Sequence, residues 1–218
     1  DIITGSTGAD IITGAGGVDT ITGGNAVDTI TGGAGNDSID AGAGNDIIII
    51  ATAGEADGDT IDGGADTDVL KLSTGGTDTF STDNKLQNVE TIQAHASGSI
   101  VVLTGQTEAF TITGGAGADT ITGGGGVDTI TGAGGVDTIT GGAGNDIITG
   151  GAGNDIITVD SGTDTVTDLG GGGSGGDDDV VIVSSGAKLS ATGVVDFSAT
   201  SATQNNATDA GSAVLAAA

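Results

Sequence analysis

One aspartate recurs at every ninth residue over two long stretches of the chain. The first stretch holds Asp1, Asp10, Asp19, Asp28, Asp37 and Asp46, and after four extra residues the series continues with Asp59 and Asp68. The second stretch holds Asp119, Asp128, Asp137, Asp146, Asp155 and Asp164, with a copy out of phase at Asp178. A period that stays in phase over so many units predicts a repeat architecture, in which each unit stacks on its neighbours.

Each unit divides into a glycine-rich turn of six residues and a strand of three, such as Thr-Ile-Thr. The strand alternates polar and apolar residues, so its central aliphatic points to one side and its neighbours to the other. So short a strand needs copies of itself to pair with. We therefore predict an all-β fold, a parallel β-roll or β-solenoid with 18 residues, two units, in each coil. The predicted core aliphatics are Ile12, Ile21, Ile30, Ile39, Ile48, Ile61, Leu70, Ile121, Ile130, Ile139, Ile148, Ile157, Val166 and Val180.

The composition excludes several classes of protein. The chain has no cysteine, and its formal charge is −27 with only three basic residues, Lys71, Lys85 and Lys188. Disulfides and thiolate sites are therefore absent, and neither nucleic acid nor an anionic membrane is an expected partner. No apolar run reaches the roughly 20 residues that span a bilayer, so we expect no membrane insertion. With 46 glycines among 218 residues, the chain has the composition of a disordered protein, but the regular aliphatics argue against disorder.

The aspartates indicate a bound cation. In an 18-residue coil Asp10 lies next to Asp28, and Asp19 next to Asp37, at about the 4.8 Å spacing of neighbouring strands. Like charges this close repel by about 1 kcal/mol or more per pair. Three lysines cannot neutralise them, whereas a hard divalent ion binds carboxylates together with the carbonyls of glycine turns. Calcium, which takes six to eight oxygens, fits better than magnesium, and zinc or copper would require His or Cys.

These units resemble the RTX nonapeptide, Gly-Gly-x-Gly-x-Asp-x-aliphatic-x, of hemolysin-type calcium-binding proteins. Gly141-Gly142-Ala143-Gly144-Asn145-Asp146 is one such turn, and the match covers residues 1–71 and 114–167 closely, with a weaker unit at 173–181. The resemblance implies one calcium ion between turns that are one coil apart. The earlier turn supplies the carbonyls of its second and fourth positions and its Asp. The later turn supplies the carbonyls of its first and third positions and its own Asp.

Carried onto the first block, the resemblance implies that these ligands share an ion: Ser6, Gly8 and Asp10 with Gly23, Asn25 and Asp28; Ala15, Gly17 and Asp19 with Gly32, Ala34 and Asp37; Gly24, Ala26 and Asp28 with Ala41, Ala43 and Asp46. In the second block the implied sets are Gly115, Gly117 and Asp119 with Gly132, Gly134 and Asp137; Gly124, Gly126 and Asp128 with Gly141, Ala143 and Asp146; Ala133, Gly135 and Asp137 with Gly150, Ala152 and Asp155; Gly142, Gly144 and Asp146 with Val159, Ser161 and Asp164. Asp68 and Asp178 are further candidate ligands, and we expect roughly eight to ten ions.

The repeats depart from the family pattern in places. The four-residue insertion around residues 50–53 is predicted to break the pairing of Asp37 and Asp46 with later turns. Glu55, Asp57 and Asp59 then offer either a modified site or only an acidic loop. Valines also replace the commoner Asn just before the aspartate at Val18, Val27, Val127 and Val136.

We divide the chain into a first repeat block (1–71), a metal-poor segment (72–113), a second block (114–183) and a C-terminal cap or tail (184–218). Residues 72–113 keep short strands, as in residues 89–92, 100–103 and 110–113, and are read either as further coils or as a separate hairpin domain. Residues 170–176 form a glycine-rich insertion that lacks the Lys-Ser/Thr of a phosphate loop. Residues 177–179 close a last ion site or form a solvated acidic cluster. Val194-Val195-Asp196-Phe197 is a candidate strand, and the small apolar residues 213–218 cap the solenoid, move freely or lead onward.

No set of residues suggests an enzyme, since the single His95 has no second His, no Cys and no nucleophile motif beside it. The chain begins in mid-repeat without methionine, so we expect it to be part of a longer protein. The family resemblance implies type I secretion and folding outside the cell. We expect a non-enzymatic, calcium-dependent surface-layer (S-layer) or adhesin component, with self-assembly or a cell-surface glycan as partner. The alternative is the C-terminal secretion and folding module of an RTX enzyme or toxin. Ice binding by outward threonines is less favoured, because Ile147, Ile156, Ile47 and Asp40 interrupt their rows.

Overall fold

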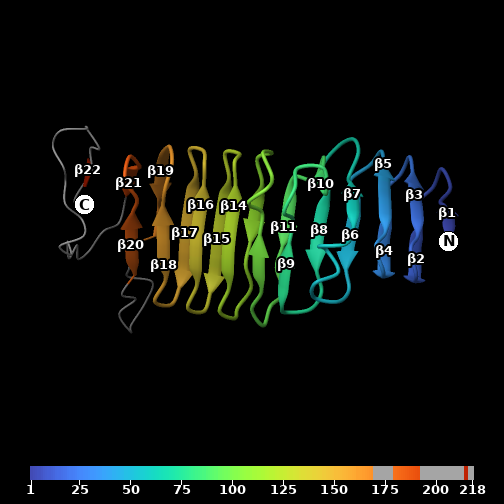
Figure 1. The fold of residues 1–218 in the computed structure, drawn as a ribbon, viewed down its shortest axis with the longest axis horizontal. Helices are drawn as coiled ribbons and strands as arrows, with labels where there is room; N and C mark the ends of the chain where they lie inside the picture. The colour runs from blue at the N-terminus through green and yellow to red at the C-terminus, as the bar shows by residue number, and fades with distance from the viewer. Residues whose placement is uncertain (169–178, 192–213, 216–218) are drawn as a thin grey trace.

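Stacked parallel strands build the whole of the described chain in a computed structural model, which covers residues 1–168, 179–191 and 214–215 (Figure 1). Threonine and isoleucine favour extended backbone, and the glycine turns between them reverse the chain direction. Ile12 pairs with Ile30 and Ile21 with Ile39, which is a register of 18 residues. The predicted all-β, parallel β-solenoid of 18-residue coils is confirmed.

One face of the solenoid is a single sheet of 11 strands, here called the long sheet. Its strands are, in spatial order, β2 (Ile11–Gly16), β4 (Thr29–Ala34), β6 (Ile47–Ile50), β8 (Val69–Leu72), β11 (Thr91–Gln93), β13 (Thr111–Thr113), β15 (Thr129–Gly134), β17 (Ile147–Ala152), β19 (Thr163–Val166), β21 (Lys188–Ala191) and β22 (Val214–Leu215).

The opposite face consists of two shorter sheets. The first has five strands: β1 (Ile2–Thr4), β3 (Thr20–Gly24), β5 (Ser38–Gly42), β7 (Thr60–Asp62) and β10 (Leu86–Gln87). The second has six: β9 (Thr77–Thr79), β12 (Ile100–Val102), β14 (Thr120–Gly124), β16 (Thr138–Gly142), β18 (Ile156–Val159) and β20 (Val180–Val183). Because β10 pairs with β7 and β9 pairs with β12, this face is divided within the coil that contains β9 and β10.

Several strands are longer than the three residues predicted. β2 and β17 each run for six residues, into the first half of the turn. The reason is that turn backbones one coil apart also pair, as Ala15 does with Gly33 and Gly16 with Ala34. The turns are therefore part of the stacked structure rather than loose connections.

The core is a narrow row of aliphatic side chains between the two faces. Ile21, Ile30, Ile121 and Ile130 are fully buried, as are most of the predicted core residues. Val180 is an exception, because its side chain is 51% exposed. The structure places Val181 opposite Ile157 instead, one residue later than predicted. Since side chains alternate between faces, a shift of one residue turns Val180 outward.

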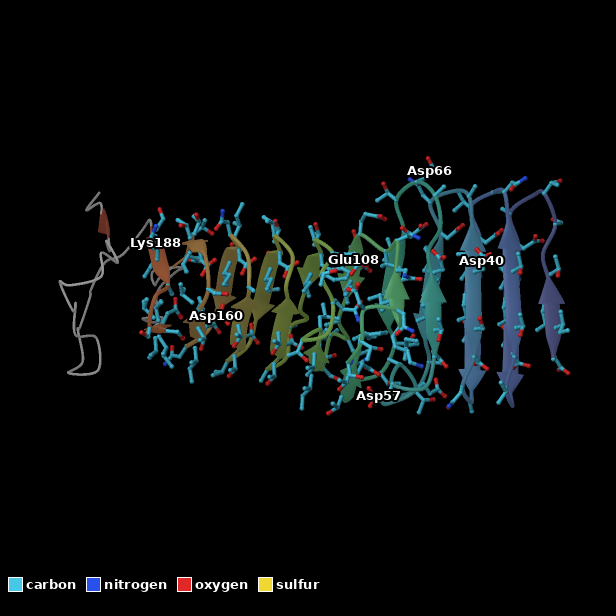
Figure 2. The ribbon with its side chains drawn as sticks, turned by 45° about the horizontal axis from the view of Figure 1, so that its top comes forward. Asp40, Asp57, Asp66, Glu108, Asp160 and Lys188 are labelled. Carbon is cyan, nitrogen blue, oxygen red and sulfur yellow. The ribbon has the colours of Figure 1, made fainter. Side chains whose placement is uncertain are left out.

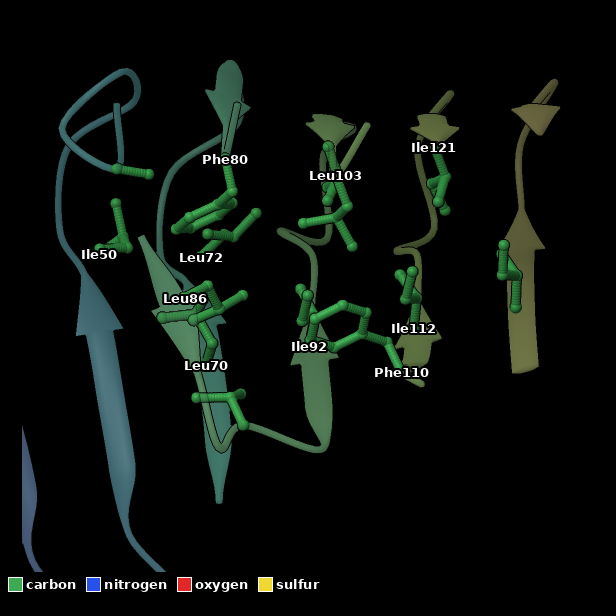
Figure 3. Close-up of a cluster of buried hydrophobic side chains, with 14 of the residues drawn as sticks. Ile50, Leu70, Leu72, Phe80, Leu86, Ile92, Leu103, Phe110, Ile112 and Ile121 are labelled. Carbon is green, nitrogen blue, oxygen red and sulfur yellow. The ribbon is translucent and has the colours of Figure 1, made fainter. Parts of the chain in front are cut away.

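Residues 72–113 add two phenylalanines to the aliphatic core. Phe80, Leu86, Leu103 and Phe110 pack between the sheets beside the aliphatics of neighbouring coils (Figure 3). The long sheet continues through this segment, because β11 pairs with both β8 and β13.

Some predicted features lie outside the described residues: Asp178, the glycine run 170–176, and the candidate strand 194–197. Of residues 213–218, only Val214 and Leu215 are described, as β22 beside β21. No helix in the described part of the chain has the length and apolar character needed to cross a membrane.

Candidate metal centre

The repeat aspartates form two columns, one along each edge of the solenoid where the turns lie. The edge that leads into the long sheet carries Asp10, Asp28, Asp46, Asp68, Asp128, Asp146 and Asp164. The edge that leads into the shorter sheets carries Asp19, Asp37, Asp59, Asp119, Asp137, Asp155 and Asp179.

Each column is held by one repeated hydrogen bond. The Oδ1 of an aspartate accepts from the backbone N–H of the aspartate one coil earlier. Asp137 Oδ1 accepts from Asp119 at 2.8 Å, and Asp146 Oδ1 accepts from Asp128 at 2.9 Å. The bond fixes the short side chain against the turn of the preceding coil.

The insertion after Ile50 does not interrupt these columns, so the prediction of broken pairing is wrong for these aspartates. Asp37 N–H donates to Asp59 Oδ1 at 2.8 Å, and Asp46 N–H donates to Asp68 Oδ1 at 2.7 Å, each across 22 residues. The additional residues lie in the turn between β6 and β7, so strand pairing on both sides is kept. Asp57 is exposed, whereas Asp59 is buried in its column.

The second carboxylate oxygen, Oδ2, of the column aspartates fits a role in binding a cation. In nine column aspartates Oδ2 is buried and has no hydrogen-bond partner, namely in Asp19, Asp28, Asp37, Asp46, Asp68, Asp128, Asp137, Asp146 and Asp164. An ionised carboxylate without such a partner costs several kcal/mol to bury. A bound cation or a proton compensates such an oxygen, and the donor set of oxygens alone suits calcium.

Burial also changes the acidity of these groups. Loss of solvation raises the pKa of Asp59, Asp68, Asp128, Asp137 and Asp164 to about 6. Hydrogen bonds from the preceding coil lower each pKa, and neighbouring carboxylates raise it further, as Asp155 and Asp119 do for Asp137. The columns are thus unfavourable as a set of bare charges.

Backbone carbonyls complete the donor set. A Cβ on Gly142 would collide with the carbonyl oxygen of Gly124, and one on Gly144 would collide with that of Gly126. The second- and fourth-position carbonyls of a turn therefore face the next coil. A Cβ on Gly132 would collide with Asp137 Oδ2, so glycine at the first position leaves room for the carboxylate.

The structure brings together the two turns of every implied ligand set. In the first block, Ser6 faces Gly24, Gly17 N–H donates to Ala34, and Ala43 N–H donates to Gly24. In the second block the bonds run from Gly134 to Gly115, Ala143 to Gly124, Gly135 to Ala152 and Gly144 to Ser161. Ligation of calcium by these particular atoms stays a prediction.

Sequence reasoning missed several residues of the columns. Glu90 continues one column, since its Oε2 accepts from Asp68 N–H at 2.8 Å. Asp179 Oδ1 accepts from Asp155 N–H at 2.9 Å, whereas Asp178 lies outside the described residues. Asp160 lies close to Asp146 and Asp164, with ligand oxygens within 4.8 Å of one another. The sequence signal for Asp179 is the acidic run 177–179, and that for Asp160 is an acidic residue at the second position of a repeat turn.

Asparagine just before the column aspartate also has a structural reason. Asn145 Oδ1 accepts from Thr163 N–H at 2.8 Å, one coil later, and Asn45 accepts from Thr67 N–H at 3.3 Å. Valine at this position cannot make the bond, and Val18, Val27, Val127 and Val136 are exposed.

A family model matches part of each repeat block. The RTX calcium-binding nonapeptide repeat matches four times, at residues 1–29, 22–49, 111–139 and 131–166. No curated protein matches the chain significantly. The matches stop before residues 50–71, although Asp59 and Asp68 continue the columns there. The unpartnered carboxylate oxygens and the oxygen-only donor set agree with the four matches, and residues 1–49 and 111–166 are similar to RTX calcium-binding nonapeptide repeats.

Proposed function

We propose that this chain is a non-enzymatic, extracellular structural module that folds when calcium binds between its turns, and that it serves in a surface layer or an adhesin. The observation that carries the proposal is the row of buried, unpartnered Asp Oδ2 atoms along both edges. Calcium supplies there the positive charge that the three lysines cannot, and it ties each turn to the next.

The charge of the chain links folding to its location. At −27, the chain without calcium repels itself, which opposes compaction. Low cytosolic calcium would keep it unfolded, and millimolar calcium outside the cell would fold it, which suits export of an unfolded chain by a type I pathway.

A structural role, rather than catalysis, agrees with the described polar groups. The buried carboxylates are fixed to backbone N–H groups in a periodic pattern instead of converging on one cleft. His95 Nδ1 contacts the Ser97 hydroxyl at 2.7 Å, within the same turn, and Ser97 is exposed. This is a local turn contact between residues two positions apart.

The primary test compares circular dichroism of the full chain in EDTA, in about 5 mM magnesium and in about 5 mM calcium. Strand content should appear only with calcium, and calorimetric titration should detect roughly eight to ten ions. Equal strand content in EDTA and calcium would refute calcium-dependent folding. For the surface role, electron microscopy and sedimentation of the calcium form should show ordered self-assembly or binding to surface glycan. A calcium-folded protein that does neither would contradict that part of the proposal.

Asp137→Ala tests the sharing of ligands between sites. Asp137 bonds to Asp119 in the coil before and to Asp155 in the coil after, so it borders two inter-turn spaces. The variant should lose or weaken two ions in the titration, whereas Asp40→Ala, at an exposed position of β5, should lose none. Loss of a single ion would show that the aspartates are not shared.

A further inference from the structure

The turn before Asp164 differs from the other repeat turns at its second position. Asp160 occupies this position, where the turns before Asp28, Asp146 and Asp155 carry glycine and the turn before Asp10 carries Ser6. In those turns the second position offers an ion only its carbonyl or, at Ser6, a neutral hydroxyl. Asp160 adds a charged side chain at the same place, on a turn toward the C-terminal end of the solenoid (Figure 2).

Asp160 is fixed beside the preceding coil. Its Oδ1 accepts from Gly142 N–H at 3.1 Å, and Gly142 is the second-position residue of the turn one coil earlier. The same oxygen accepts from Ser161 N–H at 3.1 Å. These bonds hold the carboxylate over the space between the turns 141–146 and 159–164.

Three carboxylates meet in that space. One oxygen each from Asp146, Asp160 and Asp164 lie within 4.8 Å of one another, and no other three acidic or histidine side chains of the described residues do so. Asp146 and Asp164 are buried, and the Oδ2 atom of each has no hydrogen-bond partner. The Asp160 charge contributes to the raised pKa of both neighbours, which reflects the same proximity.

We propose that Asp160 is a third carboxylate ligand for the ion between these two turns, and that this is the tightest calcium site of the described repeats. The inference rests on the proposed calcium-dependent function. Calcium affinity of oxygen sites increases with the number of charged ligands, and the ordinary turn pair supplies two carboxylates. A site with three carboxylates also gains more affinity when calcium is replaced by a trivalent ion than the neighbouring sites with two carboxylates do.

Asp160→Asn separates charge from structure, because asparagine still accepts the Gly142 and Ser161 hydrogen bonds. In calorimetric calcium titration of the full chain, the tightest step should weaken on the order of tenfold, while the later steps remain. In a parallel titration with lanthanum, the same step should weaken more than it does with calcium. If Asp160 had a purely structural role, the variant would weaken the calcium step and the lanthanum step by the same factor. Asp40→Asn, with the same charge change at an exposed site on β5, should leave both titrations as in the wild type.

Asp160→Ser provides a second variant that installs the residue found at the same position before Asp10. It should show the same loss even if the asparagine variant folds poorly. A tightest step that is unchanged in both variants overturns the role of Asp160, while binding at the other sites leaves the proposed function intact. A wild-type chain that binds no calcium overturns the proposed function itself.

Discussion

The repeat blocks and residues 72–113 share one solenoid but are stabilised by different means. In the blocks, most strands bury one or two small or aliphatic side chains, and nine buried aspartates of the turns have a second oxygen without a hydrogen-bond partner. In residues 72–113, Phe80, Leu86, Leu103 and Phe110 fill the core (Figure 3). There the buried Gln106 donates from Nε2 to the Thr82 carbonyl at 2.7 Å.

The repeat blocks and the middle segment differ in the apolar surface that they bury. A thin aliphatic row buries little apolar surface, so the blocks depend on cations between their turns. In the middle segment two buried phenylalanines add apolar burial, so its coils should depend less on cations, although the Oδ2 of the buried Asp78 has no hydrogen-bond partner there either. We therefore expect the stability of the repeat blocks to depend strongly on calcium and that of residues 72–113 to depend on it less.

Calcium removal should have the largest effect and should affect the blocks first. In EDTA, amide hydrogen exchange should lose protection early in β3–β6 and β14–β18, because their buried carboxylates are then uncompensated. Protection should persist longest in β8, β11 and β13, next to the aromatic core. Simultaneous loss of protection in all of these strands would mean that the two regions are not distinct.

Acid should partly replace calcium in the blocks. Burial raises the folded-state pKa of Asp128, Asp137 and Asp164 to about 6, above the ordinary 3.8. The folded state therefore takes up protons before the unfolded state does, so stability without calcium increases as the pH falls from about 6 toward 4 and is lost above that range. Circular dichroism in EDTA should show more strand at pH 5 than at pH 7. An equal spectrum at both values would show that carboxylate charge is not what opposes folding.

Phe80→Ala should destabilise the middle segment without affecting the ions. Phe80 is fully buried, and such a truncation costs about 3–5 kcal/mol. Thermal unfolding in saturating calcium should show the loss, while the number of bound ions stays as in the wild type. Phe197 lies outside the described residues, so Phe110→Ala, at 2% exposure, is the better matched variant and should behave alike. A reduced ion count in either variant would link the aromatic core to the calcium sites.

Asn145→Val should have the smallest effect. It removes the bond from Thr163 N–H at 2.8 Å and costs about 1 kcal/mol. Val136→Asn is the reverse change on the other edge and should be neutral or slightly stabilising. Denaturant titration in calcium measures both. If Asn145→Val lowered the free energy of unfolding more than Phe80→Ala does, the turn hydrogen bond would matter more than the packed core, contrary to this prediction.

The nine-residue period was sufficient to predict the strands, the coil and the aspartate columns, because stacking in register leaves few alternatives. The period could not show how irregular segments fit. The four-residue insertion around residues 50–53 was expected to break the pairing of Asp37 and Asp46, but the longer turn leaves the strand register and the bonds to Asp59 and Asp68 in place. Beyond Asp164 the glycine run interrupts the nine-residue spacing. Asp179 and Val181 therefore occupy the positions that the sequence predicted for Asp178 and Val180. Asp160 looked like an ordinary turn residue until the fold placed it beside Asp146.

The divided face has a mechanical consequence for a rod of this kind. From β1 to β21, strand pairing otherwise connects successive coils on both faces, but between β7 and β12 only the long sheet is continuous, through β8, β11 and β13. Under a load that bends the solenoid, this coil is a weak point on the divided face, opposite the continuous long sheet. Bending should open the divided face more easily than the long sheet, and stiffness should therefore depend on the direction of the force. Phe80 and Leu86 fill the core at this coil, where strand pairing on one face is interrupted.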